Sequence, residues 1–308
     1  MPDLDLAVVV VTWNSMREID ICLNSLLADL AESGLNSRVI VVDGASTDGT
    51  PDHVAQKYPQ LGLIVSPDNI GFGRCNNLGL KHAGFESADA PRAAYMINPD
   101  TQTHPGATRA LFDTLMSDEK IGLVGAQLTY GDGTFQHAAF HFPGLRQMYA
   151  EFFATPGRFI EGGFNGRYPR RLYEAGEPFK VDCVLGATMM IRREVIASTG
   201  MFDAQFFMYC EEIDWAWRIH DAGWEARCVP AAHVTHFGGQ STQQVKPRAI
   251  VNLWASRIQL FFKYYPTWKL AIASRMLAEG MRRKIKRERD PEVRTAYETV
   301  RQMAKGLR

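Results

Sequence analysis

Leu6-Ala-Val-Val-Val-Val11 is a continuous apolar run, mostly of valine, close to the start of the chain. Such a run is typical of a strand that is buried on both faces of a parallel sheet. Arg38-Val-Ile-Val-Val-Asp43 repeats the pattern, and the segment Met16–Ser33 between the two runs predicts a helix. A strand, a helix and a second buried strand form a βαβ unit, so we expect an α/β fold with a doubly wound, mainly parallel sheet.

The same alternation continues along the chain. The next predicted elements are a helix at Pro51–Tyr58, a strand at Leu61–Val65, a helix at Gly73–Ala83 and a strand at Ala93–Ile97. A further strand and helix are expected at Val184–Arg192 and Glu211–Ala222, after a loop-rich insertion at Tyr130–Lys180. Ligands of such sheets bind beyond the carboxyl ends of the strands.

Composition and charge argue against several classes of protein. With 34 basic and 34 acidic residues among 308, the formal net charge is zero, and nothing indicates a nucleic-acid partner. The five cysteines are odd in number and form no Cys-x-x-Cys pair, which indicates a reducing compartment. We see no signal peptide, and no apolar run reaches the roughly 18–20 residues of a transmembrane helix. We therefore expect a cytoplasmic protein.

The end of the chain has a different character. From Pro247 onward the pattern is helical and increasingly basic, with a break expected at Pro266. We expect a catalytic domain at residues 1–245 and a C-terminal basic amphipathic helical extension at residues 246–308.

Residues 263–290 of this extension contain nine Lys or Arg against three acidic residues. Large apolar residues such as Trp268, Leu277 and Met281 are interleaved with them. This combination suits an anionic membrane surface, such as the inner face of the plasma membrane. A solvated helix packed on the protein or on a second subunit fits the same pattern equally well.

Polar loops follow the first two predicted strands. They read Thr12-Trp13-Asn14-Ser15 and Asp43-Gly-Ala-Ser-Thr-Asp-Gly-Thr50. Hydroxyls, N–H groups and carboxylates at strand ends suit a nucleotide, but the same residues also cap helices and close turns. The chain has no Gly-x-Gly-x-x-Gly fingerprint and no P-loop lysine, so neither NAD nor ATP is indicated.

A glycine-rich stretch and a tripeptide add further polar candidates. In the stretch Asp68–Gly79, glycines allow close backbone approach, and Arg74 could pair with a phosphate. Asn98-Pro-Asp100 follows the predicted strand Ala93–Ile97 and offers hard oxygen ligands to Mg²⁺ or Mn²⁺. His236 could supply one nitrogen ligand. Ordinary turns, a capped helix and a packing histidine are the alternatives.

Three carboxylates lie close together in Glu211-Glu212-Ile-Asp214-Trp-Ala-Trp-Arg218. On a helix, Glu211, Asp214 and Arg218 share one face, while Glu212 points about a quarter-turn away. Acidic residues in a first turn also complement the helix dipole. The cluster is denser than a helix start requires, so we take Glu211, Glu212 and Asp214 as catalytic candidates and favour the glutamate pair as general base.

In this order, the segments from Leu6 to Thr242 resemble the family 2 glycosyltransferases, particularly the bacterial rhamnosyltransferase-like branch. The resemblance implies a GT-A fold and an inverting, metal-dependent transfer in cell-surface polysaccharide synthesis. The donor would be a dTDP- or UDP-sugar, with rhamnose as the sugar this branch suggests. The acceptor would be a saccharide, free or linked to polyprenyl diphosphate.

The resemblance also assigns expected roles. The nucleotide base and ribose would be contacted by Thr12, Trp13 and Asp43. The remaining donor-binding candidates are Asn14, Arg74, Asn77 and Asn98. The metal-binding position matches Asp100, and the position of a histidine that can complete the metal site matches His236. The catalytic carboxylate matches Glu212.

The chain departs from the family pattern at the general base, where the family usually has Asp and this chain has Glu212. Glutamate keeps the chemistry and adds one methylene of reach. Gly44-Ala45 replaces the usual Asn-Gly after Asp43, and Cys75 replaces a common glycine. A sugar nucleotidyltransferase is one alternative, but it would need a glycine-rich basic loop after the first strand. A catalytically inactive carbohydrate-binding relative and a peripheral membrane scaffold are the others.

Overall fold

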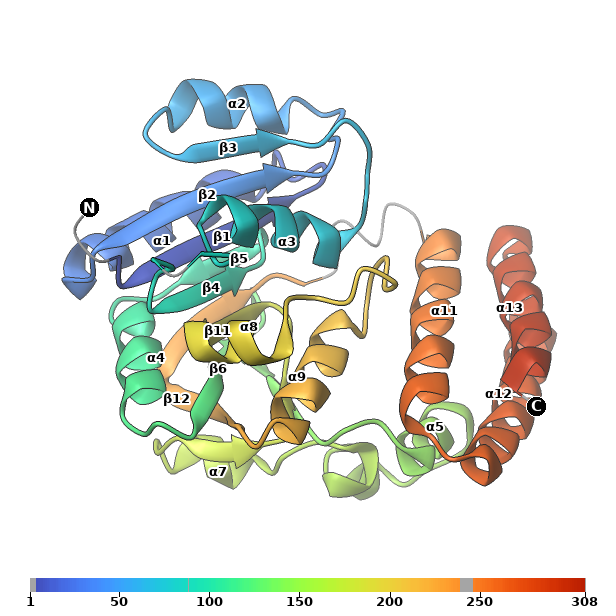
Figure 1. The fold of residues 1–308 in the computed structure, drawn as a ribbon. Coiled ribbons are helices and arrows are strands. Elements are labelled where there is room, and N and C mark those ends of the chain that lie inside the picture. The colour runs from blue at the N-terminus through green and yellow to red at the C-terminus, as the bar shows by residue number, and fades with distance from the viewer. Residues whose placement is uncertain (1–3, 88, 239–245, 308) are drawn as a thin grey trace.

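The computed structural model describes residues 4–87, 89–238 and 246–307. Its centre is one large mixed sheet with helices on both faces (Figure 1). The main strands, in spatial order, are β3 Gly62–Val65, β2 Ser37–Asp43, β1 Leu6–Thr12, β4 Ala93–Ile97, β11 Thr188–Arg192, β6 Ile121–Thr129, β12 Glu225–His236 and β5 Thr101–Thr103. The expected α/β fold with a mainly parallel sheet is confirmed.

Strand pairing gathers polar strand ends at one edge of the sheet. β1 pairs in parallel with β2 and β4, and Thr12 lies opposite Asp43. β11 runs antiparallel between β4 and β6, and β12 runs parallel to β6. β12 also pairs antiparallel with β5, which sets His236 opposite Thr101. The carboxyl ends of β1, β2, β4 and β12 therefore lie at the same edge.

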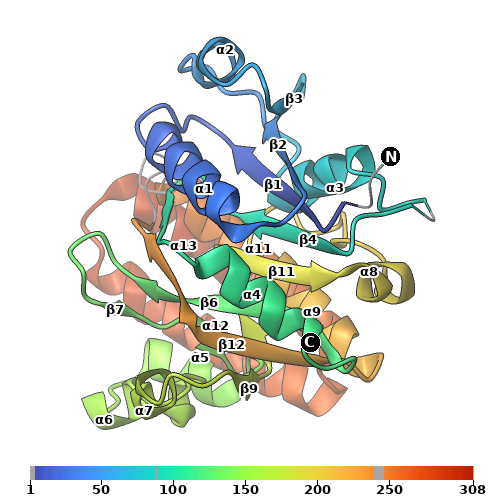
Figure 2. The ribbon, with the colours of Figure 1, turned by 90° about the vertical axis from the view of Figure 1, so that its left-hand side faces the viewer.

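The helices form layers on the two faces of this sheet. α1 Ile19–Ser33 and α4 Ala107–Met116 cover one face, which Figure 2 turns toward the viewer. The other face carries α3 Phe72–His82, α8 Arg193–Thr199 and α9 Glu211–Asp221, while α2 Thr50–Lys57 lies beside β3. α1 begins three residues later than predicted, since the Met16 N–H donates to the Asp48 carboxylate instead of entering a helix.

The predicted insertion is more ordered than its composition indicates. It contains β7 Phe135–Gln136, β8 Ala139–Phe140, α5 Leu145–Phe152, α6 Gly157–Ile160, a 3₁₀ turn at Gly163–Asn165, α7 Arg170–Glu174 and the start of β9 Phe179–Val181. The single strand expected at Val184–Arg192 is also divided. β10 Cys183–Val184 pairs with β8, and residues 185–187, which belong to neither strand, connect β10 to β11.

Three long helices end the chain: α11 Lys246–Tyr264, α12 Thr267–Arg287 and α13 Pro291–Met303, with a 3₁₀ turn at Ala304–Leu307. Pro266 separates α11 from α12, as predicted. The helices share a second hydrophobic core with Met148 of α5. Leu277 and Met281, for which the sequence left contact with a membrane and packing on the protein equally open, are fully buried in that core.

The junction between the two expected domains at residue 245, and Thr242, where the family resemblance ends, lie outside the described residues. None of the helices in the described ranges has the length and apolarity that crossing a bilayer requires.

Candidate active site

Two cavities meet at the carboxyl edge of the sheet. The strand-end cavity has a volume of about 280 Å³, and its lining includes Thr12, Trp13, Asn98, Asp100, Glu211 and His236. The helix cavity, of about 560 Å³, lies between α9, α5 and α11. Leu185, Tyr209 and Glu212 line both cavities. If each cavity holds a bound molecule, Glu212 therefore lies where the two molecules meet.

The end of β1 forms one wall of the strand-end cavity. Thr12 and Trp13 line it directly. Asp43 is fully buried behind Thr12 and accepts hydrogen bonds from the Thr12 hydroxyl at 2.8 Å and from the Ser46 N–H at 2.8 Å. Asn14, predicted to bind the donor, has a left-handed backbone (φ 51°), and its side-chain oxygen accepts from the N–H of Thr47 at 2.8 Å. This side chain thus joins two loops of the site.

The pairing of β5 with β12 brings Asp100 and His236 together. The Nε2 atom of His236 lies 3.4 Å from Oδ1 of Asp100. The other ring nitrogen, Nδ1, is within hydrogen-bonding distance of the Gln136 side chain, whose Nε2 is 3.1 Å and whose Oε1 is 3.3 Å away. In the tautomer in which Nδ1–H donates to Oε1, Nε2 keeps its lone pair on the side of Asp100, the arrangement usual for a metal-binding histidine.

These residues fit a divalent cation. Besides Asp100 and His236, the cavity wall includes Asn98, whose buried Oδ1 has no hydrogen-bond partner. Oxygen ligands with one imidazole suit Mg²⁺ or Mn²⁺. Within the described part of the chain, no three His, Cys, Asp or Glu side chains converge as a metal site.

Glu211 and Glu212 begin α9 at the junction of the cavities. The residues before them, Tyr209 (φ 71°) and Cys210 (φ 66°), both have left-handed backbones, which are costly for residues with a Cβ and cluster at functional sites. Burial raises the pKa of Glu212. It raises that of Glu211 far more, aided by the neighbouring negative charge, and Glu211 Oε2 is buried without a partner.

Comparison with known proteins identifies the chain. Residues 7–200 match the family described as glycosyl transferase family 2. A protein of Mycobacterium tuberculosis, named N-acetylglucosaminyl-diphospho-decaprenol L-rhamnosyltransferase, is 31% identical over 251 residues, which cover 77% of each chain. The chain belongs to glycosyl transferase family 2. The glycosyltransferase activity that the sequence motifs predicted is therefore established at the level of the family.

Solved structures agree on the fold of this glycosyltransferase. GalNAc-T7, determined with UDP, GalNAc and Mn²⁺, superimposes with a TM-score of 0.58 at 12% identity over 97% of this chain and 55% of its own. The mannosyltransferase PcManGT of Pyrobaculum calidifontis, determined with GDP-Man and Mn²⁺, gives 0.51 at 17% identity over 98% and 84%. The expected GT-A fold is confirmed.

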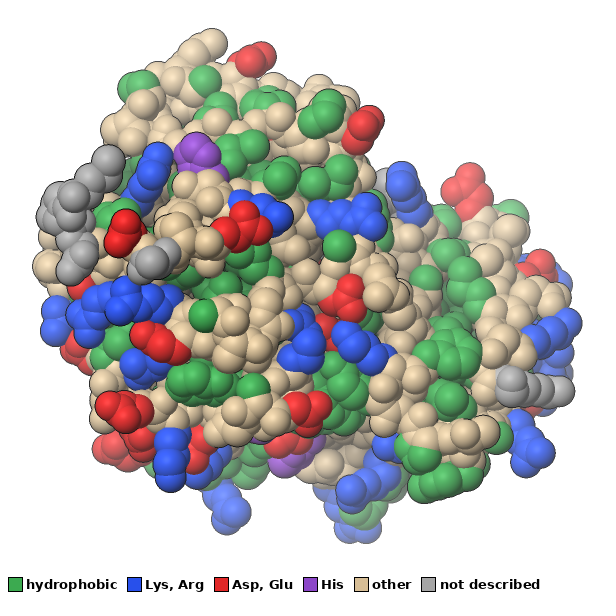
Figure 3. Space-filling view, in the orientation of Figure 1, with side chains coloured by type: hydrophobic (Ala, Val, Ile, Leu, Met, Phe, Trp, Pro, Cys, Tyr) green, Lys and Arg blue, Asp and Glu red, His purple; other side chains and the backbone are tan. Residues whose placement is uncertain are grey.

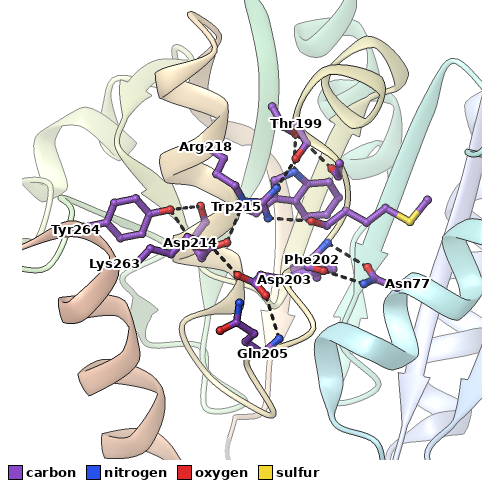
Figure 4. A network of polar contacts seen from close by, with 12 residues as sticks. Asn77, Thr199, Phe202, Asp203, Gln205, Asp214, Trp215, Arg218, Lys263 and Tyr264 are labelled. Carbon is purple, nitrogen blue, oxygen red and sulfur yellow. Dashed lines mark hydrogen bonds and ion pairs between the residues drawn. The ribbon is translucent and has the colours of Figure 1, made fainter. Parts of the chain in front are cut away.

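Two predicted donor-binding residues of the glycosyltransferase have other partners. Arg74 Nε donates to the carbonyl oxygen of Ala204 at 2.8 Å. The Asn77 side chain both donates to the Phe202 carbonyl at 2.8 Å and accepts from its N–H at 3.0 Å (Figure 4). Neither residue is among those that line the two cavities in the described structure. Both secure the loop that leads to α9, and contact of either residue with the donor stays a prediction.

Asp214, the third catalytic candidate, lies at the centre of a buried ion-pair network (Figure 4). Its carboxylate is fully buried and pairs with Arg218 at 2.9 Å and with Lys263 at 2.6 Å. The Tyr264 hydroxyl donates to it at 2.8 Å. Lys263 pairs with Asp203 as well, at 2.9 Å. Two cations and a hydroxyl occupy this carboxylate, which lines neither cavity in the described structure.

Several residues of this site had no signal in the sequence. Gln136 lies in the insertion and reaches His236 only through the pairing of β7 with β6 and of β6 with β12. The helix cavity is lined largely by α5 and α11, which come from the insertion and from the expected C-terminal extension. Tyr209 precedes the acidic segment that begins at Glu211, and its left-handed backbone is what distinguishes it.

Proposed function

We propose that this glycosyltransferase moves rhamnose, with inversion, from a dTDP- or UDP-linked donor to a saccharide carried on a polyprenyl diphosphate, and that it depends on Mg²⁺ or Mn²⁺. The observation behind the proposal is the position of Glu212 between two cavities that touch. The sugar and the lipid-linked acceptor follow the name of the mycobacterial relative. Such an acceptor favours a cytoplasmic enzyme at the inner face of the plasma membrane.

The donor belongs in the strand-end cavity in this proposal. Thr12 and Trp13 contact the nucleotide, and Asp43 fixes the rotamer of Thr12 through their hydrogen bond. Asp100, His236 and Asn98 hold the metal. When bound, the metal neutralises the diphosphate and makes it a better leaving group.

The acceptor enters from the helix cavity, and Glu212 removes the proton of its attacking hydroxyl. The oxygen then attacks the anomeric carbon from the face opposite the diphosphate, which inverts the configuration there. Burial raises the pKa of Glu212, which makes its carboxylate a stronger base than that of an exposed glutamate. Burial and the neighbouring negative charge raise the pKa of Glu211 well above its ordinary value, and in this proposal Glu211 binds the sugar rather than accepting the proton.

Replacing Glu212 by Gln tests this assignment. The amide keeps the size of the side chain and cannot accept the proton, so kcat for transfer should fall by roughly 10²–10⁴-fold. Binding of the donor should change little, because the lost interaction belongs to the transition state. Glu211→Gln is the matched variant and should lower kcat less. If kcat falls more in Glu211→Gln than in Glu212→Gln, the general base is Glu211. If both variants transfer sugar at near-normal rates, neither carboxylate is the base and the mechanism is wrong.

A further inference from the structure

The helix cavity combines apolar walls with fixed cations. Its apolar lining comes mainly from α5, α6 and α11 and includes Met148, Ile160, Leu253, Trp254 and Phe261. Two arginines also line it, and each pairs with a carboxylate: Arg167 with Glu161, and Arg257 with Glu151. A pocket for a free saccharide would be expected to present mostly hydroxyl, amide and carboxylate groups. This lining instead suits a ligand that has an anionic part and a hydrocarbon part.

Arg257 is held in place on both sides of its guanidinium group. The group lies 4.8 Å from the centroid of the Trp254 ring, and Nη1 pairs with Oε2 of Glu151 at 2.6 Å. Glu151 also pairs with Lys284 at 3.4 Å. One carboxylate thus serves two cations, so this group of three side chains has an excess positive charge. When an anion binds Arg257, Glu151 keeps Lys284 as its partner.

We propose that Arg257 binds the diphosphate of the lipid-linked acceptor, with Arg167 as a second cation, and that the apolar wall receives the start of the lipid chain. This inference rests on the proposed function and adds a site to it. The planar guanidinium presents paired N–H donors that match two phosphate oxygens, and stacking on Trp254 lowers the entropy lost on binding. An acceptor fixed there has its sugar on the Glu212 side of the cavity.

Binding of farnesyl diphosphate provides the test, with farnesol as the uncharged counterpart. Saturating UDP or dTDP and Mn²⁺ keep the strand-end cavity occupied, so the probe reports on the helix cavity. We expect Arg257→Gln to bind farnesyl diphosphate roughly tenfold or more weakly, as for the loss of a charge-assisted bidentate contact, and farnesol as the wild type does. Arg275→Gln, at an exposed position on α12, is the control and should behave as the wild type.

Unfolding temperatures and donor hydrolysis of each variant report whether the fold and the donor site are intact. Unchanged binding of farnesyl diphosphate by Arg257→Gln overturns the inference, and so does an equal loss for farnesol. If Arg167→Gln weakens the binding of farnesyl diphosphate and Arg257→Gln does not, the diphosphate binds Arg167. That result overturns the assignment to Arg257. Absence of any sugar transfer by the wild type defeats the proposed function separately, since the binding measurement does not need turnover.

Discussion

Asp100 is one of the three side chains, with His236 and Asn98, that hold the metal in our proposal. Asp100→Asn keeps the size and removes the charge, and we expect transfer to fall by roughly 10²-fold or more, because a bound cation supplies several kcal/mol of charge stabilisation. Mn²⁺ titrations in the presence of nucleoside diphosphate should show weaker binding. Asp113→Asn, at an exposed ion pair on α4, is the control. Full activity of the wild-type protein in excess chelator would contradict the metal assignment.

The raised pKa of Glu212 leads to a prediction about how kcat/KM depends on pH. Its pKa is raised above the ordinary value of 4.5 by burial, and the carboxylate must be ionised to act as base. The value of kcat/KM should therefore fall as the pH drops, with a midpoint above 4.5. The profile is to be measured at two saturating Mn²⁺ concentrations, since a midpoint that moves with Mn²⁺ belongs to the metal site. A midpoint at or below 4.5 would show that the base is not the buried Glu212.

Individual residues of this site differ in how far the sequence could predict them. Thr12, Asp100 and Glu212 follow strand ends or begin a helix, so their approximate place was fixed by the βα pattern. Asn77 and Asp214 lie on helices, where the partner of a side chain depends on which segment packs against that face. For Asp214 this segment is α11, about 50 residues further along the chain, and local spacing contains no information about it.

Among the elements, α12 and α5 meet at Gly280. A Cβ there would lie 2.2 Å from the Phe152 ring. Gly280→Ala should improve intrinsic helix propensity by about 1 kcal/mol. The clash costs typically 1–3 kcal/mol, so we expect net destabilisation in urea unfolding. The KM for the acceptor should also rise, since α5 lines the helix cavity. Gly157→Ala, which has open space around it, should leave both unchanged. A Gly280→Ala protein as stable as the wild type would show that α5 moves aside freely.

The elements also differ in how visible they were in the sequence. β1 and β2 are buried on both faces, so their apolar runs were plain. β12 contains Pro230, alternates in burial and shifts register between Val229 and His233. For these reasons its sequence does not show the pattern of a regular strand. α5 has eight residues, and the surface that buries it belongs to α12. A helix so short owes its stability to that tertiary contact rather than to its own sequence.

At the scale of the whole molecule, the C-terminal helices form part of the site rather than an appendage. α11 reaches the GT-A domain through Lys263 and Tyr264 on Asp214, and through Leu260 packed with Phe206 and Cys210. The same helix lines the helix cavity. The helix cavity, in which we place the acceptor, is therefore built from α5 and α11 together, on either side of the boundary expected at residue 245.

Membrane attachment stays a prediction, but the structure changes which residues it involves. Figure 3 shows hydrophobic side chains gathered over the C-terminal helices. Near the turn at Pro266, exposed large apolar residues are Phe262 at 51%, Trp268 at 63% and Ile272 at 39%. Arg282 and Arg283 on α12 are exposed, although both pair with Glu279. Attachment should therefore combine these three apolar side chains with electrostatic attraction to anionic lipid.

Replacing Phe262, Trp268 and Ile272 together by Ser tests this arrangement. We expect the wild-type protein to co-sediment with phosphatidylglycerol vesicles and less with phosphatidylcholine, with binding that weakens as salt is added. The triple variant should bind roughly tenfold or more weakly, because each buried apolar side chain contributes on the order of 1.5–3 kcal/mol at full burial and only part of that at an interface. Val65→Ser, which removes an equally exposed apolar side chain at the end of β3, should bind as the wild type does.

Transfer to a short, water-soluble acceptor should be the same in the wild type, the triple variant and Val65→Ser, since none of the replaced side chains lines either cavity in the described structure. Equal vesicle binding by the triple variant and the wild type would mean that the apolar residues near Pro266 do not face lipid. No binding by the wild type would mean that the exposed basic and apolar side chains of these helices serve a protein contact instead.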